Sequence, residues 1–377
     1  MKLAFPRIGD SHMYGRLLFM ELGVEMVVPN PNSRAGLERG AAVSPEEICL
    51  PFKMMAENLI SAWEMGADTA IMPSTMGPCR LGEYGELLDV VLQGHGCDYR
   101  WILLDSPSAI GLKELSSRLK SVAEGSDCTM LRKAGILAGI YKLIKGFEKL
   151  ETEARIISAY EKEQGAAKGI LQKCRRDLES AGSIAGAMKI VAGHRRRLRG
   201  LPLDKAANPL KLLLTGEIYT LIDAFANHHI EENLMDSGVA FEKHISIGWW
   251  LRNTIVNPFG GIAAELGKNP YMPHRIGGYA KETIGHALEY KKQGYDGIIQ
   301  VFPVGCMPEI VAKSVLEGFR KEHGLPVLSI IYDEMGGEAG YRTRIEAFID
   351  MLRIKKEKKD VLFGDRRGIG KHGFRSN

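Results

Sequence analysis

The sequence has no long apolar run and no strong excess of charge of either sign. No stretch approaches the roughly 18 consecutive apolar residues that a membrane helix needs, and no apolar targeting segment follows the opening residues. Fifty basic and 46 acidic residues give a net charge of +4, which is too balanced to indicate a nucleic-acid partner. We therefore expect a soluble, cytoplasmic protein that binds neither membranes nor nucleic acid.

Cysteine is scarce, and several metal and nucleotide motifs are missing. Six cysteines are spread over the whole chain: Cys49, Cys79, Cys97, Cys128, Cys174 and Cys306. A disulfide scaffold would be shorter and richer in cysteine. No C-x-x-C pair occurs, which disfavours a zinc ribbon or a compact ferredoxin loop, and no G-x-x-x-x-G-K-[ST] loop is present. The segment 228–232 lacks the H-E-x-x-H order and is interpreted as a cluster at the surface end of a helix.

The remaining pattern predicts an α/β protein. With 377 residues, two or three domains are expected. Short apolar strands alternate with helical segments over residues 1–107 and again over 208–377, which is typical of βαβ units and parallel sheets. Residues 108–207 are rich in Lys, Glu, Ala and Leu with helical spacing. We predict two parallel-sheet lobes, 1–107 and 208–377, with the helical region 108–207 between them.

Three of the cysteines share a local context, a turn marked by Gly or Pro ahead of a helix. Cys49 precedes the predicted helix 51–65, whereas Cys79 and Cys306 each follow a buried strand. Turns of this kind gather at the carboxyl edge of a parallel sheet, where ligands bind. A helix N-terminus also stabilises the thiolate form that binds iron. We therefore predict an iron–sulfur cluster that bridges the two lobes.

Other residues leave alternatives open. Each of the three cysteines taken alone is also compatible with an ordinary buried side chain. The fourth cluster position falls to water, to Glu217, to Cys97 or to another group. Glu217 follows a strand, so it is expected either to line the site or to cap the next helix. Asp333 and Glu334 follow the last strand and are expected to face the cleft or to cap a turn.

At these cysteines the chain resembles the 2-hydroxyacyl-CoA dehydratase subunit superfamily, in its branch of CoA-substrate-specific enzyme activase-related proteins. The resemblance covers most of the chain in order. Its motifs are C-x-P-x-K at 49–53, G-P-C-R-x-G-x-Y at 77–84, the cysteine turn at 305–308 and T-R-x-E-A-F at 343–348. The family implies Rossmann-like lobes with a [4Fe–4S] cluster at their junction, held here by Cys49, Cys79 and Cys306, and an iron open to water or substrate.

The resemblance also implies a function. An ATP-dependent activase or another low-potential donor would supply one electron, and the chain would act as an electron-transfer or reductase component. The open iron would serve small-molecule reduction or dehydration of an acyl-CoA, which is anaerobic chemistry. The alternatives are a non-catalytic iron–sulfur scaffold or sensor, and a plain small-molecule binder with incidental cysteines. Whether the chain is an enzyme stays open, and a homodimer is the default expectation.

Overall fold

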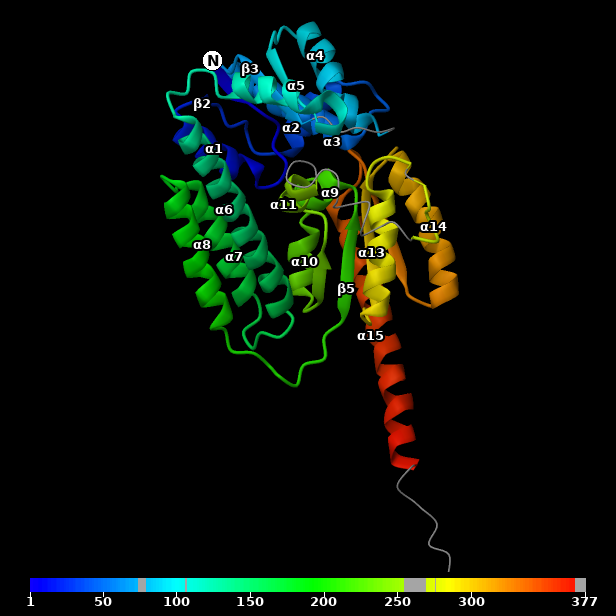
Figure 1. Ribbon diagram of the computed structural model, residues 1–377. Coiled ribbons are helices and arrows are strands. Elements are labelled where there is room, and N and C mark those ends of the chain that lie inside the picture. The colour runs from blue at the N-terminus through cyan, green and yellow to red at the C-terminus, as the bar shows by residue number, and fades with distance from the viewer. Residues whose placement is uncertain (74–78, 106, 254–268, 275, 370–377) are drawn as a thin grey trace, which may run out of the picture.

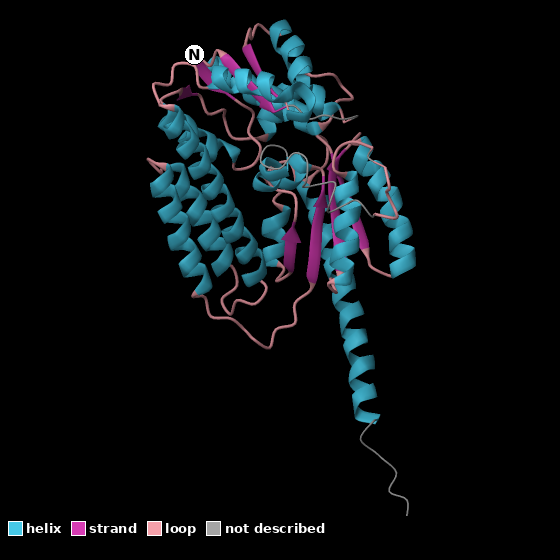
Figure 2. Cartoon of the chain, viewed as in Figure 1, coloured by secondary structure: helices cyan, strands magenta, loops and turns pink. Residues whose placement is uncertain are grey.

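The computed structural model describes residues 1–73, 79–105, 107–253, 269–274 and 276–369. Within them, the chain forms two parallel sheets of four strands each, with helices packed around them (Figures 1 and 2). The predicted α/β fold with two lobes is therefore confirmed. In this described part of the chain, no helix combines the length and the apolar character needed to cross a bilayer.

The N-terminal lobe surrounds a sheet with the strand order β2-β1-β3-β4. Its strands are β1 (Lys2–Ala4), β2 (Glu25–Met26), β3 (Thr69–Pro73) and β4 (Arg100–Leu104). Its helices are α1 (Ser11–Leu22), α2 (Arg34–Val43), α3 (Leu50–Glu64), the 3-10 turn η1 (Arg80–Glu83), α4 (Tyr84–Gly94) and α5 (Pro107–Val122). Strand β3 is apolar and buried because helices cover it, as expected for a central strand of a parallel sheet.

The C-terminal lobe has the sheet order β6-β5-β7-β8. Its strands are β5 (Lys211–Gly216), β6 (Ala240–Lys243), β7 (Gly297–Pro303) and β8 (Val327–Tyr332). Its helices are α9 (Ile218–Ile222), α10 (Ile230–Asp236), α11 (Ile247–Leu251), α13 (Ala280–Lys292), α14 (Met307–His323) and α15 (Glu338–Ile369). In Figure 1, α15 runs away from the sheet. Counted from its own first strand, each sheet has the order 2-1-3-4, which places a crevice for ligands beside the carboxyl ends of its first and third strands.

A bundle of three helices joins the lobes. Its members are α6 (Met130–Ile157), α7 (Ala166–Glu179) and α8 (Ile184–Arg199). Helix α6 packs on α1 of the first lobe and on β6 of the second, and one continuous apolar core runs through all three parts. Helix α5, which begins the predicted helical region, packs instead on β4. The bundle therefore fixes how the two sheets face each other.

Local sequence explains where several helices begin and end. The side chains of Ser33, Thr129 and Ser183 accept hydrogen bonds from backbone N–H groups in the first turns of α2, α6 and α8, which is the usual role of an N-cap. Helices α1 and α14 end at Gly23 and Gly324, whose φ angles are 73° and 64°. Glycine adopts this left-handed conformation without steric cost, so both helices stop where the sequence allows a sharp turn.

Candidate functional site

The three cysteines with the shared context each occupy the N-cap position of a helix. Cys49 precedes α3, Cys79 precedes η1 and the following α4, and Cys306 precedes α14. A proline stands in the first turn of both α3 and α14, a position that suits proline because the N–H it lacks has no helical partner there. Cys49 and Cys306 therefore lie at the positive ends of the α3 and α14 dipoles, whereas Cys79 begins a single 3-10 turn.

The structure brings these three cysteines to one cavity of about 310 Å³ between the lobes. Cys49 and Cys79 reach it from the N-terminal lobe, and Cys306 reaches it from the end of β7. The other lining residues are Pro51, Arg80, Leu81, Tyr84, Glu217, Pro303, Gly305, Met307 and Pro308. Glu217 follows β5 and Cys306 follows β7, so the cavity lies at the crevice expected from the strand order.

Arg80 links the two sides of this cysteine cavity. Its Nε donates a hydrogen bond to the Cys49 sulfur at 3.1 Å, and its guanidinium also donates to the carbonyl oxygen of Gly305 at 3.3 Å. Gly305 has a φ angle of 76°, and a Cβ atom at this position would lie 2.9 Å from Arg80. The glycine thus lets the cation approach, and the cation lies where it can offset negative charge on a thiolate.

The surroundings of the cavity disfavour the charged thiolate form of two of its cysteines. Burial raises the pKa of the Cys79 thiol, and the nearby Glu217 and Cys49 raise it further, while the Leu81 amide acts in the opposite direction. Burial also raises the pKa of the Cys306 thiol far above its usual range, with Glu217 and Glu309 adding to the effect. Without a cation these two thiols are protonated at neutral pH, so a metal that binds them must release protons.

Glu217 both lines the cavity and caps α9. Its two carboxylate oxygens accept hydrogen bonds from the N–H groups of Tyr219 at 2.9 Å and Thr220 at 2.8 Å, and the Thr220 hydroxyl donates to it as well. The expected helix-capping role is therefore present. Since these bonds already engage both oxygens, the carboxylate is held in place rather than free to turn toward a ligand.

Cys97 does not line this cavity. It precedes β4, whereas Cys79 follows β3, and these two strands are parallel neighbours. The two cysteines therefore lie at opposite edges of the sheet. Of the G-P-C-R-x-G-x-Y motif, residues 77 and 78 lie outside the described residues.

Gly216, the last residue of β5, fixes the chain that leads to Glu217. Its φ angle is 137°, and an added Cβ would lie 1.9 Å from the Val301 carbonyl oxygen on β7. We expect Gly216→Ala to lower the free energy of unfolding by at least about 1–3 kcal/mol, because it combines strain with a backbone clash. Urea unfolding measures this. Gly318→Ala, in α14 with nothing near its Cβ, is the control, and it should be neutral or stabilising.

Lys53, four residues after Cys49, joins the lobes beside the cysteine cavity. It is 3% exposed, and its Nζ donates to the Glu334 carboxylate at 2.5 Å and to the Glu46 carbonyl oxygen at 3.0 Å. Arg34 also donates to the Glu334 carbonyl oxygen. Glu334 thus faces the interface between the lobes, while Asp333 caps the turn by accepting from the Met335 and Gly336 N–H groups.

The sequence marks Lys53 as the last residue of the C-x-P-x-K motif, but the motif does not indicate a contact between the lobes. A further clue is a lysine in the first turn of an otherwise apolar helix, where a buried cation needs a partner.

Comparison with known proteins agrees with the family resemblance described from the sequence. Residues 208–352, less than half of the chain, match the family model described as 2-hydroxyglutaryl-CoA dehydratase, D-component. No curated protein matches the chain. The matched residues cover all strands of the C-terminal lobe and end within α15, and they include the β5 and β7 ends that supply Glu217 and Cys306. This match confirms the resemblance of the chain to the 2-hydroxyacyl-CoA dehydratase subunit superfamily.

Proposed function

We propose that the chain holds one [4Fe–4S] cluster through Cys49, Cys79 and Cys306 and acts as a low-potential electron-transfer or reductase component. The observation that carries this proposal is the cysteine cavity itself, in which three cysteines at helix N-cap positions, from two lobes, line one space of about 310 Å³. Thiolate donors are the ones that iron–sulfur clusters use.

The donor set fits a cluster better than a single ion. A structural zinc ion needs four ligands, each about 2.0–2.3 Å from one centre. In the part of the chain that the structure describes, no group of three His, Cys, Asp or Glu side chains is arranged to hold such an ion. Three thiols that line a larger space match an inorganic core of several atoms. The N-termini of α3 and α14 and the Arg80 cation would stabilise the negative charge that the thiolates carry.

When bound, such a cluster supplies one-electron chemistry and one iron that no protein thiol occupies. Glu217 is engaged in capping α9 and Cys97 lies at the far edge of its sheet, so in this proposal the fourth position is left to water or substrate. Cys49 and Arg80 hold one side of the site, and Cys306 holds the other. A separate ATP-dependent activase or another low-potential donor supplies the electron, and a small molecule or an acyl-CoA is the acceptor.

Anaerobic isolation of the full chain tests the proposal. We expect about four iron and four sulfide per chain, with an EPR signal that appears on reduction with dithionite. Folded chain that stays free of iron under strictly anaerobic reconstitution would overturn the cluster. Transfer of an intact cluster to another protein, without turnover of any acyl-CoA, would instead favour the scaffold or sensor alternative.

A further inference from the structure

A second cavity, of about 300 Å³, lies where the N-terminal lobe, the helical bundle and the C-terminal lobe meet. We call it the junction cavity. Its walls come from the turn after β1 and the start of α1, from α6 and α7, and from the segment between α9 and α11. None of the three cysteines of the proposed cluster lines it. Its size is at the lower end of the range for small-molecule sites.

The charges around the junction cavity are unequal. Seven Asp or Glu residues line it, against three Arg or Lys residues. All three cations already have partners. Arg7 donates to the Pro29 carbonyl oxygen, Arg175 donates to Asp10 and Glu151, and Lys243 pairs with Glu231. Two of the carboxylates are also paired with cations outside the lining, Glu148 with Lys145 and Glu231 with Arg155. A formal excess of two negative charges therefore remains that a ligand could neutralise.

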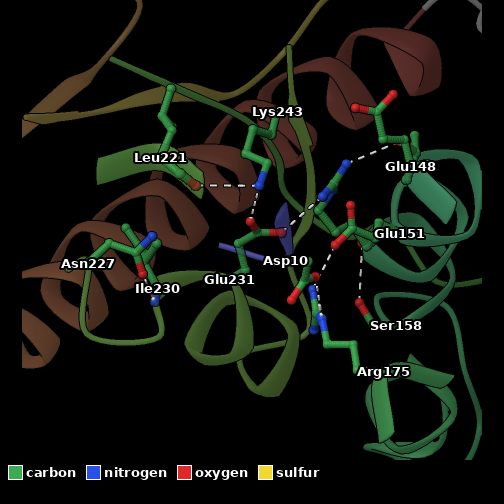
Figure 3. A network of polar contacts seen from close by, with 12 residues as sticks. Asp10, Glu148, Glu151, Ser158, Arg175, Leu221, Asn227, Ile230, Glu231 and Lys243 are labelled. Atoms are coloured by element: carbon green, nitrogen blue, oxygen red, sulfur yellow. Dashed lines mark hydrogen bonds and ion pairs between the residues drawn. The ribbon is translucent and has the colours of Figure 1, made fainter. Parts of the chain in front are cut away.

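Asp10 and Glu151 each keep one carboxylate oxygen that can accept a hydrogen bond from a ligand. Figure 3 shows Asp10, Arg175 and Glu151 pointing toward one another, with Arg175 donating to Asp10 at 2.9 Å and to Glu151 at 2.6 Å. Each carboxylate uses one oxygen for this contact, and the other oxygen accepts no hydrogen bond from the described residues. Asp10 is the N-cap residue of α1, yet its side chain makes no capping bond. Its carboxylate therefore faces the cavity and does not bond to the first turn of the helix.

Tyr14 provides an independent sign of a ligand. It is only 6% exposed and lines the junction cavity, yet its hydroxyl makes no hydrogen bond with any residue in the described part of the chain. The Nε2 atom of His12, also on α1, is buried and has no partner among the described residues. Buried polar side chains almost always have a partner, so the Tyr14 hydroxyl is expected to bond to something that enters the cavity.

We propose that the junction cavity binds a small organic cation with primary ammonium groups, of the size of a short linear diamine. The surplus of carboxylates favours a cation, and an excess of more than one charge favours two ammonium groups over one. Tyr14 and the unpaired oxygens of Asp10 and Glu151 accept hydrogen bonds from N–H groups. Among the described residues that line the junction cavity, no three His, Cys, Asp or Glu side chains are arranged to hold a metal ion, so a ligand that donates hydrogen bonds fits better than a bare metal ion.

Such a ligand would touch all three parts of the molecule. Because it binds the folded arrangement and not the unfolded chain, it should raise the thermal midpoint, and the stabilisation should grow with the logarithm of the ligand concentration once that concentration exceeds Kd. The proposal is independent of the cluster, since no residue of the cysteine cavity takes part. If the cluster experiment fails, the proposal for the junction cavity still stands. If the diamine does not bind, the proposal for the cluster still stands.

Calorimetric titration of the full chain with 1,4-diaminobutane tests the site. We expect saturable binding and a raised thermal midpoint, and Tyr14→Phe should weaken binding about tenfold or more because it removes a hydrogen bond to a charged group. Tyr332→Phe is the matched control, since it also removes a buried hydroxyl without a partner among the described residues but lies outside the cavity. It should bind the diamine as the wild type does.

Four results would overturn the site. They are the absence of saturable binding, equal stabilisation by tetramethylammonium at the same ionic strength, equal stabilisation by Mg²⁺, and wild-type affinity in Tyr14→Phe. Tetramethylammonium has the charge but no N–H donor, so it separates a general salt effect from recognition. Circular dichroism of both tyrosine variants establishes that a loss of binding is not a loss of fold.

Discussion

Cys306→Ser, reconstituted anaerobically, is expected to retain less than roughly one of the about four iron atoms that we propose for the wild-type chain. Within the described residues, Cys306 is the one thiol that reaches the cysteine cavity from the C-terminal lobe. Its removal leaves two thiols, both on the N-terminal lobe, and a serine hydroxyl is a far weaker ligand because it does not ionise near neutral pH. Iron and sulfide per folded chain, together with the EPR signal, measure the loss.

Cys174→Ser is the matched control for this variant. Cys174 is also fully buried, but it lies on α7 in the helical bundle, away from the cysteine cavity. The two substitutions are chemically identical, so a general effect of placing a hydroxyl in an apolar core would appear in both. If Cys306→Ser keeps as much iron as Cys174→Ser while both stay folded, the two lobes do not share a cluster.

Much of the fold follows from local sequence. Alternating apolar strands and amphipathic helices predict two parallel sheets, and the structure has them. The turn residues around Cys49, Cys79 and Cys306 predict cysteines at helix starts, and each is an N-cap. These features are predictable because they depend on a few neighbouring residues, such as Pro51 and Pro308 in the first turns of their helices.

Contacts between distant residues could not be predicted in this way. Lys53 pairs with Glu334, and Asp10 pairs with Arg175. Neither of these two pairings is indicated by the spacing or the periodicity of the sequence. The order of the strands is also a property of the packed sheets, and many orders are compatible with one alternating pattern. Sequence alone therefore indicates which residues lie at an edge, whereas the structure shows which edges face each other.

Glu231 illustrates this limit. The segment 228–232 is interpreted from sequence as a surface cluster, but Glu231 holds together two buried cations. Arg155, whose side chain is 4% exposed, donates to it at 2.9 Å, and Lys243, whose side chain is 6% exposed, pairs with its other oxygen. Figure 3 shows the Glu231 and Lys243 side chains pointing toward each other. The surface interpretation is therefore wrong for this residue.

We expect Glu231→Gln to lower the free energy of unfolding by about 3–5 kcal/mol, because it leaves two cations buried without their shared partner. Denaturant unfolding near pH 7 measures the change. Glu232→Gln is the control, since Glu232 accepts a hydrogen bond from Gln172 and is 34% exposed. Its loss should cost less than about 1 kcal/mol. Equal effects of the two substitutions would contradict the proposed role of Glu231.

The pH dependence gives a second, independent check of the same ion pairs. Burial alone would raise the pKa of Glu231, but Lys243 and Arg155 outweigh it and lower the pKa to about 2, against about 4.3 for an unfolded chain. A carboxyl with a lowered folded-state pKa stabilises the protein above its unfolded value, and that stabilisation is lost as the pH falls toward the folded value. The stability gap between the wild type and Glu231→Gln should therefore be constant above about pH 5 and narrow below about pH 4. A gap that widens on acidification would mean that Glu231 is not ionised in the folded protein.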